Sequence, residues 1–542
     1  MTTSQPYVEV LVSIARNSAI LFAGLAGGLA VIAGLAYLYL YPLQLLRFSG
    51  RNLPGPEPTN LLWGNQKEIM GKNTGDVQTE WFEKYGKVMR YRYALGAQHI
   101  SLNDPVALGH IFQHTDTFGK MYRTKRILSD ILGDGLLTAD PVNHRRQRRV
   151  LNPAFSVTAI REMVPDFFGV AYKLRDAVAA EAGKPSLDEK KPQEVEVHEL
   201  VSHATLDIIG VSGFGARDLS SSDSALGTSY ADLLTARNQA NIFDFLQITY
   251  PAFKNLPTKA TRKIKDSRTI TDKLGHDIVA ERKKALEAAG DTDTRDMLSR
   301  LLRANMAPDL KPEQRMTDDE VMGQITTLMF AGHETTSTAM SWALWRLAIH
   351  QDIQAKLRAE LMTIDTDEPS IDALNALTYL EKFVHEVLRL DDPVALSYRI
   401  ALKDAVVPLS APVTGRDGST IEALTVKKGT MFHTPIISLN RSKDIWGDDA
   451  DKFNPDRDTN PSTQVPGMYG NLLTFLSGPH HCIGYRFALA ELKVLLFVLV
   501  RSFNFELPAE PYTIVPHTLI TMRPSINGKI SMRLVVKPVA GQ

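Results

Sequence analysis

The stretch that decides the fold is FLSGPHHCIG, residues 475–484, which contains Cys482, the only cysteine of the 542-residue chain. The apolar spacing after it predicts a buried helix over residues 487–499, whose first turn would point unpaired N–H groups back at the sulfur. A helix amino terminus lowers the pKa of a thiol, and the thiolate is the form that binds metals. Gly478 and Gly484 would let the loop bend tightly around a flat cofactor. Because a lone cysteine is more often a small buried apolar residue, the flanking residues carry the functional interpretation.

The pattern Phe475-x-x-Gly478-x-His480-x-Cys482-x-Gly484 resembles the haem-binding loop of the cytochrome P450 family. The resemblance implies that Cys482 is the axial thiolate ligand of the iron of haem b. It also implies a mainly α-helical fold with small β-sheets (α+β). His480 departs from the family, most members of which have an arginine there in contact with a haem propionate. Imidazole, with an ordinary pKa of about 6.5, is mostly neutral at neutral pH and attracts a carboxylate less.

The composition is that of a folded chain, with 44% hydrophobic and 23% charged residues. Lys plus Arg equals Asp plus Glu at 61 each, so no net charge favours binding to nucleic acid. Length alone suggests about three or four domains of roughly 150 residues, whereas the resemblance implies one large catalytic domain over residues 59–542. A single cysteine cannot form an internal disulfide, which fits a reducing compartment.

The amino-terminal segment is apolar. Residues 17–46 carry no charged side chain, and their densest part, about residues 20–41, is long enough to cross a bilayer, which takes about 20 residues. We expect a membrane anchor over residues 1–46 with one transmembrane helix, because a cleaved signal peptide has a shorter apolar core. Arg47, Arg51 and Lys67 follow the span, so the positive-inside rule places the large domain in the cytoplasm. Residues 47–58, basic and rich in proline, would form a stiff hinge, and by resemblance the membrane is that of the endoplasmic reticulum.

A long helix is predicted between the anchor and the cysteine loop. Residues 317–320, TDDE, form a capping box, and the helix can continue to Ile349. Its centre, AGHETT at residues 331–336, combines a glycine, an acid and two threonines, which form helices weakly or are costly to bury. A segment that violates both helix propensity and the avoidance of buried polar groups is often functional. The structural alternative is that these residues form a helix kink in which the threonine hydroxyl is hydrogen-bonded.

The AGHETT run resembles the oxygen-activation motif of the family. The resemblance implies that Gly332 loosens the helix, that Thr335 hydrogen-bonds bound dioxygen, and that Glu334 relays protons to it. His333 occupies the variable place of the motif, and we expect it to face a neighbouring helix.

Residues 144–149, HRRQRR, form the densest basic run, which by composition is a solvated face or a phosphate-binding patch. Their place before LNPAF resembles the Trp-x-x-x-Arg helix of the family, whose arginine binds a haem propionate. Arg148 takes the arginine position, and His144 replaces the tryptophan. The other arginines would suit docking of an acidic electron-transfer partner. Arg399 matches a further family position that contacts a propionate, although a strand residue with an exposed tip is an equal alternative.

Glu386 and Arg389 lie one helical turn apart, which by itself is typical of a surface ion pair. Their apolar neighbours predict burial, and the spacing matches the family's Glu-x-x-Arg motif. Arg457, in FNPDR, resembles the second arginine of that buried network. We expect these three residues to have a structural role.

Apolar side chains in three other segments are candidates for the substrate pocket. Core packing is the simpler interpretation of the first of these segments, residues 118–137. In the family the corresponding segments line the pocket, as does the hairpin over residues 518–523. The candidate residues are Leu128, Ile131, Ala331, Val394, Ala395, Leu396 and Leu519.

The resemblance therefore implies a haem-thiolate monooxygenase that inserts one oxygen atom of O2 into a small lipophilic substrate, by hydroxylation or further oxidation, and we expect a terpenoid or another secondary metabolite. No nucleotide-binding fingerprint stands in a suitable setting, so the electrons must come from another protein. The resemblance implies a separate flavoprotein reductase that uses NADPH, with a cytochrome b-type donor as a further source. One alternative is a haem-thiolate isomerase or dehydratase that does not use O2. Another is a membrane-anchored haem carrier or sensor. Glu334 and Thr335 argue against both, because neither needs protons delivered to dioxygen.

Overall fold

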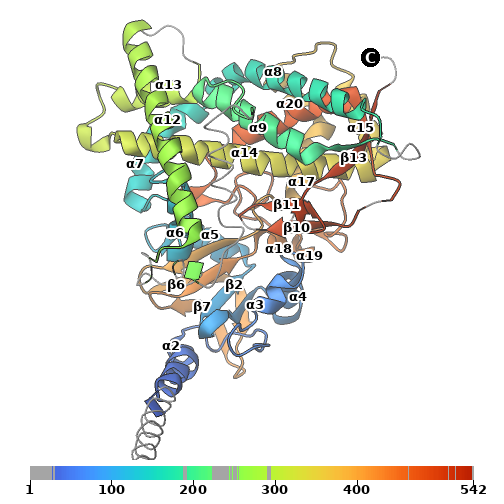
Figure 1. The fold of residues 1–542 in the computed structure, drawn as a ribbon. Helices are drawn as coiled ribbons and strands as arrows, with labels where there is room; N and C mark the ends of the chain where they lie inside the picture. The colour runs from blue at the N-terminus through green and yellow to red at the C-terminus, as the bar shows by residue number, and fades with distance from the viewer. Residues whose placement is uncertain are drawn as a thin grey trace, which may run out of the picture.

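The computed structural model describes residues 27–28, 31–186, 192–221, 243–244, 247, 253, 256–289, 295–461, 463–510, 512–518 and 520–539. These residues form a helical body with small β-sheets, as the sequence predicts. The N-terminal helix projects from the end of the molecule at which β2 (Gln98–Leu102) and β7 (Thr420–Val426) lie (Figure 1).

Most of the secondary-structure elements along the described chain are helices. The α-helices are α2 (Gln44–Arg47), α3 (Gln66–Met70), α4 (Asp76–Tyr85), α5 (Pro105–Gln113), α6 (Tyr122–Leu132), α7 (Pro141–Leu151), α8 (Val157–Ala182), α9 (Val197–Phe214), α12 (Lys259–Ala289), α13 (Met297–Met306), α14 (Asp318–Ile349), α15 (Gln351–Leu361), α16 (Ile371–Ala376), α17 (Thr378–Leu390), α18 (Ile436–Asn440), α19 (Lys443–Trp446) and α20 (Tyr485–Ser502). The remaining strands are β1 (Val88–Arg92), β3 (Phe118–Gly119), β4 (Glu194–Glu196), β5 (Ser397–Ala401), β6 (Ala405–Thr414), β8 (Met431–Thr434), β9 (Phe503–Glu506), β10 (Ile514–Thr518), β11 (Met522–Ile526), β12 (Lys529–Ile530) and β13 (Arg533–Pro538).

The core of the helical body is built around α14, which runs through its middle (Figure 1). Helix α9 packs along α14, and α8 packs against both α9 and α20. Side chains on every face of α14 are buried, which is typical of an interior helix rather than an amphipathic surface helix. The predicted boundaries of this helix are right, since Thr317 and Glu320 form the reciprocal capping box and the helix ends at Ile349.

The sheets are small. In the described chain the largest has the strand order β1-β2-β8-β5-β3, and the others are β10-β11-β12, β4-β13-β9 and the hairpin β6-β7. Strands β1 and β2 form an antiparallel hairpin. The hairpin predicted near residues 518–523 is the pair β10 and β11, which lies beside α14.

The proline-rich segment that precedes β1 lies against the domain. The Arg90 N–H donates to the carbonyl of Pro54 (2.8 Å), and the Arg416 guanidinium donates to the carbonyl of Gly55 (3.0 Å). Leu53 is 1% exposed within the main core. The predicted hinge is therefore held by the sheets at its carboxyl end.

Most of the predicted anchor lies outside the described residues, including 20–26 and 29–30 of the expected transmembrane helix. Residues 31–47 are helical, with a π-helical turn at Tyr39–Leu43 that contains Pro42. Among the residues that the structure describes, no helix has the length and apolar character needed to span a bilayer.

We expect the stability of this fold to fall in mild acid. Burial lowers the pKa of both His99 and His433, which lie on adjacent strands, from 6.5 to about 3. Below pH 6.5 these histidines bind protons in the unfolded chain but stay neutral in the folded chain. The free energy of unfolding therefore decreases as the pH falls below 6.5, and their full contribution to it is present above pH 6.5. The free energy of unfolding can be measured with urea at about pH 7.5 and 5.5. Between these two pH values we expect it to fall by about 1.4 kcal/mol less in His433→Gln than in the parent protein. An equal loss in the two proteins would contradict the assignment, and His203→Gln, at an exposed site, is the control.

Candidate active site

The loop before α20 is closed by a hydrogen bond from the Cys482 N–H to the carbonyl of Phe475 (2.9 Å). Gly478 has a φ of +66°, and a Cβ there would come within 2.3 Å of the Phe112 carbonyl oxygen, so this position requires glycine. Gly484 has a φ of −87°, and a Cβ there would meet no protein atom closer than 3.6 Å, so its predicted place beside a flat cofactor stays a prediction.

Two groups favour the thiolate of Cys482, whose side chain is accessible within the loop. Desolvation by the protein around the loop raises the pKa of the thiol even though the side chain itself is exposed, while the Gly484 N–H and the Arg148 guanidinium act to lower it. Gly484 is the N-cap of α20, so the predicted use of a helix amino terminus is present in the structure.

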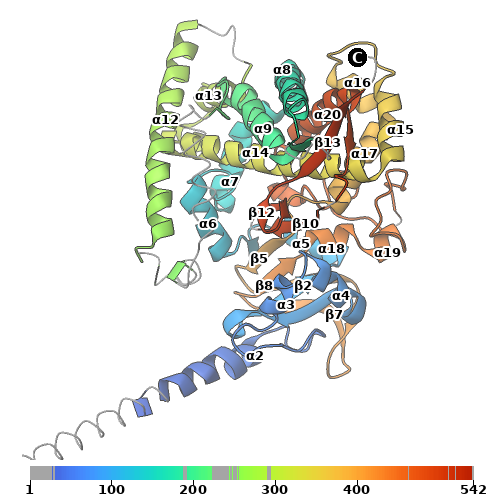
Figure 2. The same cartoon turned by 45° about the vertical axis from the view of Figure 1, so that its right-hand side comes forward.

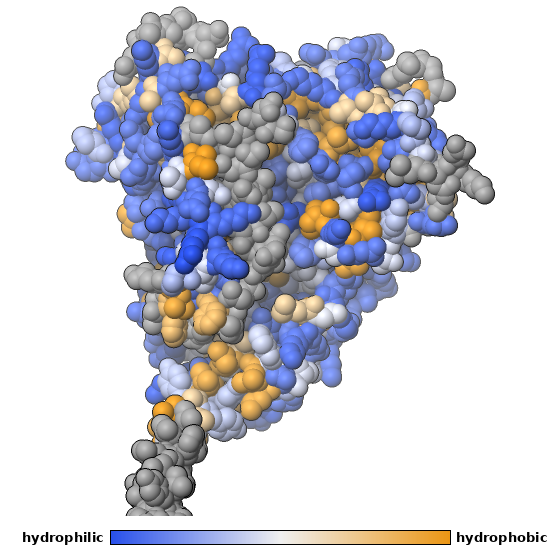
Figure 3. Space-filling model, in the orientation of Figure 1, coloured by the Kyte–Doolittle hydropathy of each residue, from blue (hydrophilic) through white to orange (hydrophobic). Residues whose placement is uncertain are grey.

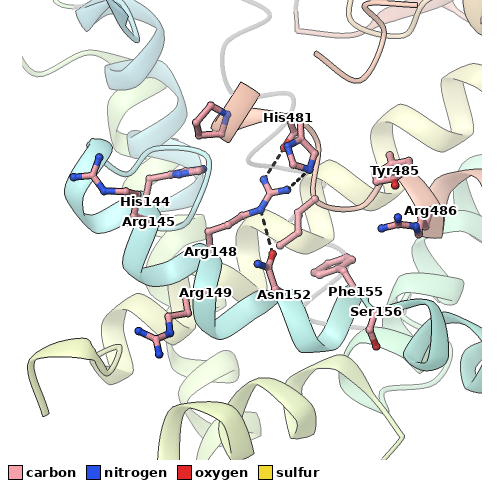
Figure 4. A pocket seen from close by; sticks show the side chains of 12 residues that line it. His144, Arg145, Arg148, Arg149, Asn152, Phe155, Ser156, His481, Tyr485 and Arg486 are labelled. Atoms are coloured by element: carbon pink, nitrogen blue, oxygen red, sulfur yellow. Dashed lines mark hydrogen bonds between the residues drawn. The ribbon is translucent and has the colours of Figure 1, made fainter. Parts of the chain in front are cut away.

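Arg148 holds the cysteine loop (Figure 4). From α7, it donates to the carbonyl of His481 (2.6 Å), lies 2.8 Å from Nε2 of the same residue, and contacts Oδ1 of Asn152 (3.3 Å). These are contacts within the protein. The predicted contact of Arg148 with a propionate stays a prediction.

His144 and His480, the two departures from the family pattern, lie against each other with ring centroids 4.0 Å apart. Burial and the neighbouring cations lower the pKa of His144 to about 3 and that of His480 to about 2, so both rings are neutral at neutral pH. In the described chain neither Nδ1 atom has a hydrogen-bond partner, although both are buried. Each can therefore donate one hydrogen bond to an acceptor that the protein itself does not supply.

Two basic side chains lie near this histidine pair: Arg399, which is buried, and Lys120, which is half-buried. Arg399 is 5% exposed, contacts the ring of Phe112, and donates to Ser397 Oγ and to the Tyr398 carbonyl (both 2.8 Å). Burial lowers its pKa to about 10, and the exposed tip considered as an alternative is wrong. Lys120, which sequence reasoning missed, donates to the carbonyl of Leu137, and its pKa is lowered to about 7 by burial and then by Arg399.

These residues fit the propionates of a haem. Among the described residues, neither Arg399 nor Lys120 forms an ion pair with a carboxylate. A cation that is removed from water without a counter-charge is costly, so these two side chains favour an anionic ligand. Two carboxylates next to the cysteine loop would meet these two cations and the Nδ1 atoms of His144 and His480.

Helix α14 runs unbroken through the AGHETT run, which corrects the prediction that Gly332 loosens it. A Cβ at Gly332 would lie 3.1 Å from a side-chain atom of Ile209 on α9. The glycine therefore lets the two helices approach closely. Thr335 is half-buried, and its hydroxyl donates to the Ala331 carbonyl (2.7 Å), which satisfies the group within the helix.

Glu334 is 6% exposed and is held by the β10–β11 hairpin. Its Oε1 accepts a hydrogen bond from the Thr521 hydroxyl (2.9 Å) and lies 3.1 Å from Nε of Arg523. Sequence reasoning assigned Glu334 but missed both partners, because they lie nearly 190 residues further along the chain. His333 faces α9, as predicted, with Nε2 2.7 Å from Ser202 Oγ.

The Glu386 network is buried, as its apolar neighbours predict. Arg389, 0% exposed, makes two bonds to the Glu386 carboxylate (2.8 and 2.9 Å) and also donates to the carbonyls of Asn440 and Ala450. Arg457 lies 3.5 Å from the same carboxylate and pairs with Asp449 (2.6 Å). The network thus joins α17 to the segment after α19.

The candidate pocket residues differ in their surroundings. Leu128 and Ile131 are buried in the main core, in agreement with the simpler interpretation. Ala395 is buried against Ile437 and Met522. Ala331, Val394 and Leu396 are half-buried, and Leu519 lies outside the described residues.

Known proteins resemble the chain over nearly its whole length. The sequence profile described as Cytochrome P450 matches residues 54–532. Cytochrome P450 monooxygenase 205 of Postia placenta is 35% identical, over 92% of this chain and 94% of the relative. Cytochrome P450 monooxygenase 128 of the same fungus is 34% identical, over 94% and 97% of the two chains. Cytochrome P450 monooxygenase claO of Ampulloclitocybe clavipes is 34% identical, over 93% and 96%.

The profile and these relatives place the chain among oxidoreductases that incorporate oxygen from O2. It belongs to the cytochrome P450 family. Membership implies a haem cofactor, a redox partner, a substrate and O2.

We expect His480→Arg to retain haem at least as well as the parent. Arginine is charged at all relevant pH values and would offer a carboxylate more donors than the neutral imidazole. The rate of haem transfer to apomyoglobin measures retention. His203→Arg adds the same charge at an exposed site and is the control. A clear loss of haem occupancy in His480→Arg alone would mean that the imidazole has another role.

Proposed function

We propose that this protein is a membrane-anchored monooxygenase that oxidises a small lipophilic substrate, with Cys482 as the haem ligand. The observation that carries the proposal is the cysteine loop itself. Its thiol is exposed and precedes Gly484, the N-cap of α20, and the basic side chains of Arg399 and Lys120 and the neutral imidazoles of His144 and His480 have no carboxylate partner among the described residues. When bound, a haem with a thiolate ligand supplies the reductive cleavage of O2.

The protein side chains have separable tasks in this proposal. With a haem bound, Cys482 would supply negative charge to the iron, and Arg399, Lys120, His144 and His480 would hold the propionates. Glu334 would provide a proton at Oε2, the carboxylate oxygen that the hairpin does not engage. The Thr335 hydroxyl, on the same helix, would hydrogen-bond O2 and pass its own proton on as it takes the one from Glu334, so that the hydroxyl stays neutral.

We expect Thr335→Ala to keep the carbon-monoxide spectrum of thiolate-bound haem while product per NADPH falls by about tenfold and peroxide rises. The hydroxyl would no longer orient O2 or pass a proton, whereas the cysteine loop is untouched. Thr338→Ala is the matched control, since Thr338 makes the same type of bond, to the Glu334 carbonyl (2.8 Å), on the same helix. Unchanged coupling of NADPH to product in Thr335→Ala would remove Thr335 from this role.

We propose that an NADPH-dependent flavoprotein reductase docks over α7, with a cytochrome b-type donor as a second source of electrons. A groove of about 530 Å³ lies beside the cysteine loop and is lined by Arg145, Arg148, Arg149 and Arg486 (Figure 4). Its cationic rim would attract an acidic partner and bring electrons close to the thiolate side.

We propose that the protein lies in the endoplasmic reticulum membrane, with a single-pass anchor over residues 1–46, a hinge over residues 47–58 and the catalytic domain, 59–542, in the cytoplasm. Large apolar side chains are exposed on the described part of the anchor and just beyond the hinge: Val31, Ile32, Leu35, Leu38, Leu46, Leu61 and Leu62. Figure 3 shows apolar side chains at the end of the domain from which the N-terminal helix projects. Such side chains suit contact with lipid.

The substrate that we propose is a terpenoid or a similar secondary metabolite. Support comes from the apolar character of the candidate pocket residues and from fungal relatives that are monooxygenases. The test is to incubate microsomes containing the protein and a reductase with terpenoids, fatty acids and aromatic compounds. Oxygenated products that depend on NADPH and O2 are expected. Rearranged or dehydrated products formed without O2 would instead favour the isomerase or dehydratase alternative.

A further inference from the structure

A cavity of about 760 Å³ lies between α9 and the strands at the carboxyl end of the chain. Figure 2 shows α9 lying over α14 beside β13. Glu199 and His203, on the cavity wall, are exposed, and Glu196 is half-exposed. The cavity wall therefore carries carboxyl and imidazole groups that solvent reaches.

Ser202 connects this cavity to α14. It lines the cavity and is half-buried, and its Oγ lies 2.7 Å from Nε2 of His333. His333 is 6% exposed, so its imidazole lies behind the serine rather than in the cavity.

The other nitrogen of His333 faces Glu334. Nδ1 lies 4.0 Å from Oε2 of the carboxylate, a gap that a small side-chain rotation or one bridging water closes. The hairpin groups Thr521 and Arg523 both engage Oε1. Oε2 is thereby left toward the imidazole.

We propose that Ser202 and His333 form the proton route from this cavity to Glu334, which deepens and rests on the proposed function. His333 transfers its Nδ1 proton to Oε2 of Glu334 while Nε2 takes the Ser202 hydroxyl proton, and the serine takes a proton from a hydronium ion in the cavity, which becomes water. Both residues stay neutral after the transfer and no electrons move. Before the next transfer the ring returns to its Nδ1–H form by losing the Nε2 proton to water and taking a proton at Nδ1 from water. Burial lowers the pKa of His333, with Glu334 opposing and His203 and Arg523 adding to the shift, which favours the neutral imidazole that such a relay needs.

The test compares Ser202→Val with Ser202→Thr, side chains of nearly equal shape that differ in the hydroxyl. Thr205→Val is the matched control. It removes a bond between the same two helices, from Thr205 Oγ1 to the His333 carbonyl (3.3 Å), but no relay group. We expect Ser202→Val to raise peroxide released per NADPH and to slow proton-dependent turnover by about tenfold, with a changed solvent isotope effect. Ser202→Thr should restore the parental values.

A second measurement does not depend on turnover. Exchange of the imidazole C2 hydrogen of His333, followed by mass spectrometry in D2O, reports access of solvent protons to this ring. We expect slower exchange in Ser202→Val than in Ser202→Thr, with His433, buried elsewhere, unchanged as an internal reference.

Three outcomes are decisive. Equal peroxide and equal His333 exchange in the valine and threonine variants would overturn the route and leave Ser202 as a helix contact. If Thr205→Val changed peroxide release and His333 exchange as much as Ser202→Val does, the route would be overturned as well, because the effects would then come from altered packing of the two helices. Absence of the thiolate-type carbon-monoxide spectrum in the parent would instead refute the proposed function, while the exchange comparison would still decide whether solvent protons reach His333 through Ser202.

Discussion

Cys482→Ala is expected to lose the carbon-monoxide spectrum of thiolate-bound haem and all NADPH-dependent product. The chain contains no second cysteine, so no other thiolate can replace this ligand. Without the sulfur, the Gly484 N–H and the Arg148 guanidinium would have no anion to stabilise. The propionate contacts would remain, so some haem could stay bound with an altered spectrum.

Absorption spectra of the purified ferric and carbon-monoxide-bound ferrous protein measure this effect. Ser477→Ala, in the same loop, is the control for damage to the loop itself. If Cys482→Ala carried haem as well as the parent, with the same spectrum, the assignment of Cys482 as the ligand would have to be abandoned.

Glu386→Gln is expected to lower the free energy of unfolding by about 3–5 kcal/mol, because it leaves the buried Arg389 guanidinium without its carboxylate. Arg389 is 0% exposed and cannot turn to water. Arg457, 3.5 Å from the same carboxylate, would lose part of its counter-charge as well. Urea or thermal unfolding measures the loss. The fraction of Glu386→Gln that still folds should show the carbon-monoxide spectrum of thiolate-bound haem, because the Glu386 network does not contact the Cys482 sulfur.

Asp372→Asn is the matched control for this substitution. It makes the same carboxylate-to-amide change in the bidentate Arg161–Asp372 pair (3.0 Å), but those side chains are 50% and 60% exposed. Water can solvate the freed arginine, so the expected loss is below about 1 kcal/mol. A similar decrease in the free energy of unfolding in Glu386→Gln and Asp372→Asn would mean that the buried Glu386 network stabilises the fold no more than an exposed ion pair does.

The sequence predicted the helices of the core well. The capping box at residues 317–320 and the predicted end at Ile349 match the observed boundaries of α14. Such signals are local, because capping and helical periodicity depend on residues within about one turn of each other.

The partners of the site could not be predicted in the same way. Lys120, Thr521 and Arg523 carry no local motif, and each acts on a residue far away in the chain. The role of Gly332 was misjudged for a related reason: its requirement is set by Ile209 on α9, which approaches within 3.1 Å of where a Cβ would lie. Ser202, the proposed link to the cavity, likewise becomes visible only once α9 is packed on α14.

The candidate residues came from the amino-acid sequence alone: one thiol just before a buried helix, an acid and a threonine at the centre of another, and, with a structural role, a Glu-x-x-Arg pair among apolar neighbours. Only the tertiary structure decided which groups surround them, from the neutral pair His144 and His480 to the hairpin that engages one oxygen of Glu334. The physical reason is that charge state and hydrogen bonding depend on burial and on neighbours within a few ångströms, and in this fold many of those neighbours come from distant parts of the chain.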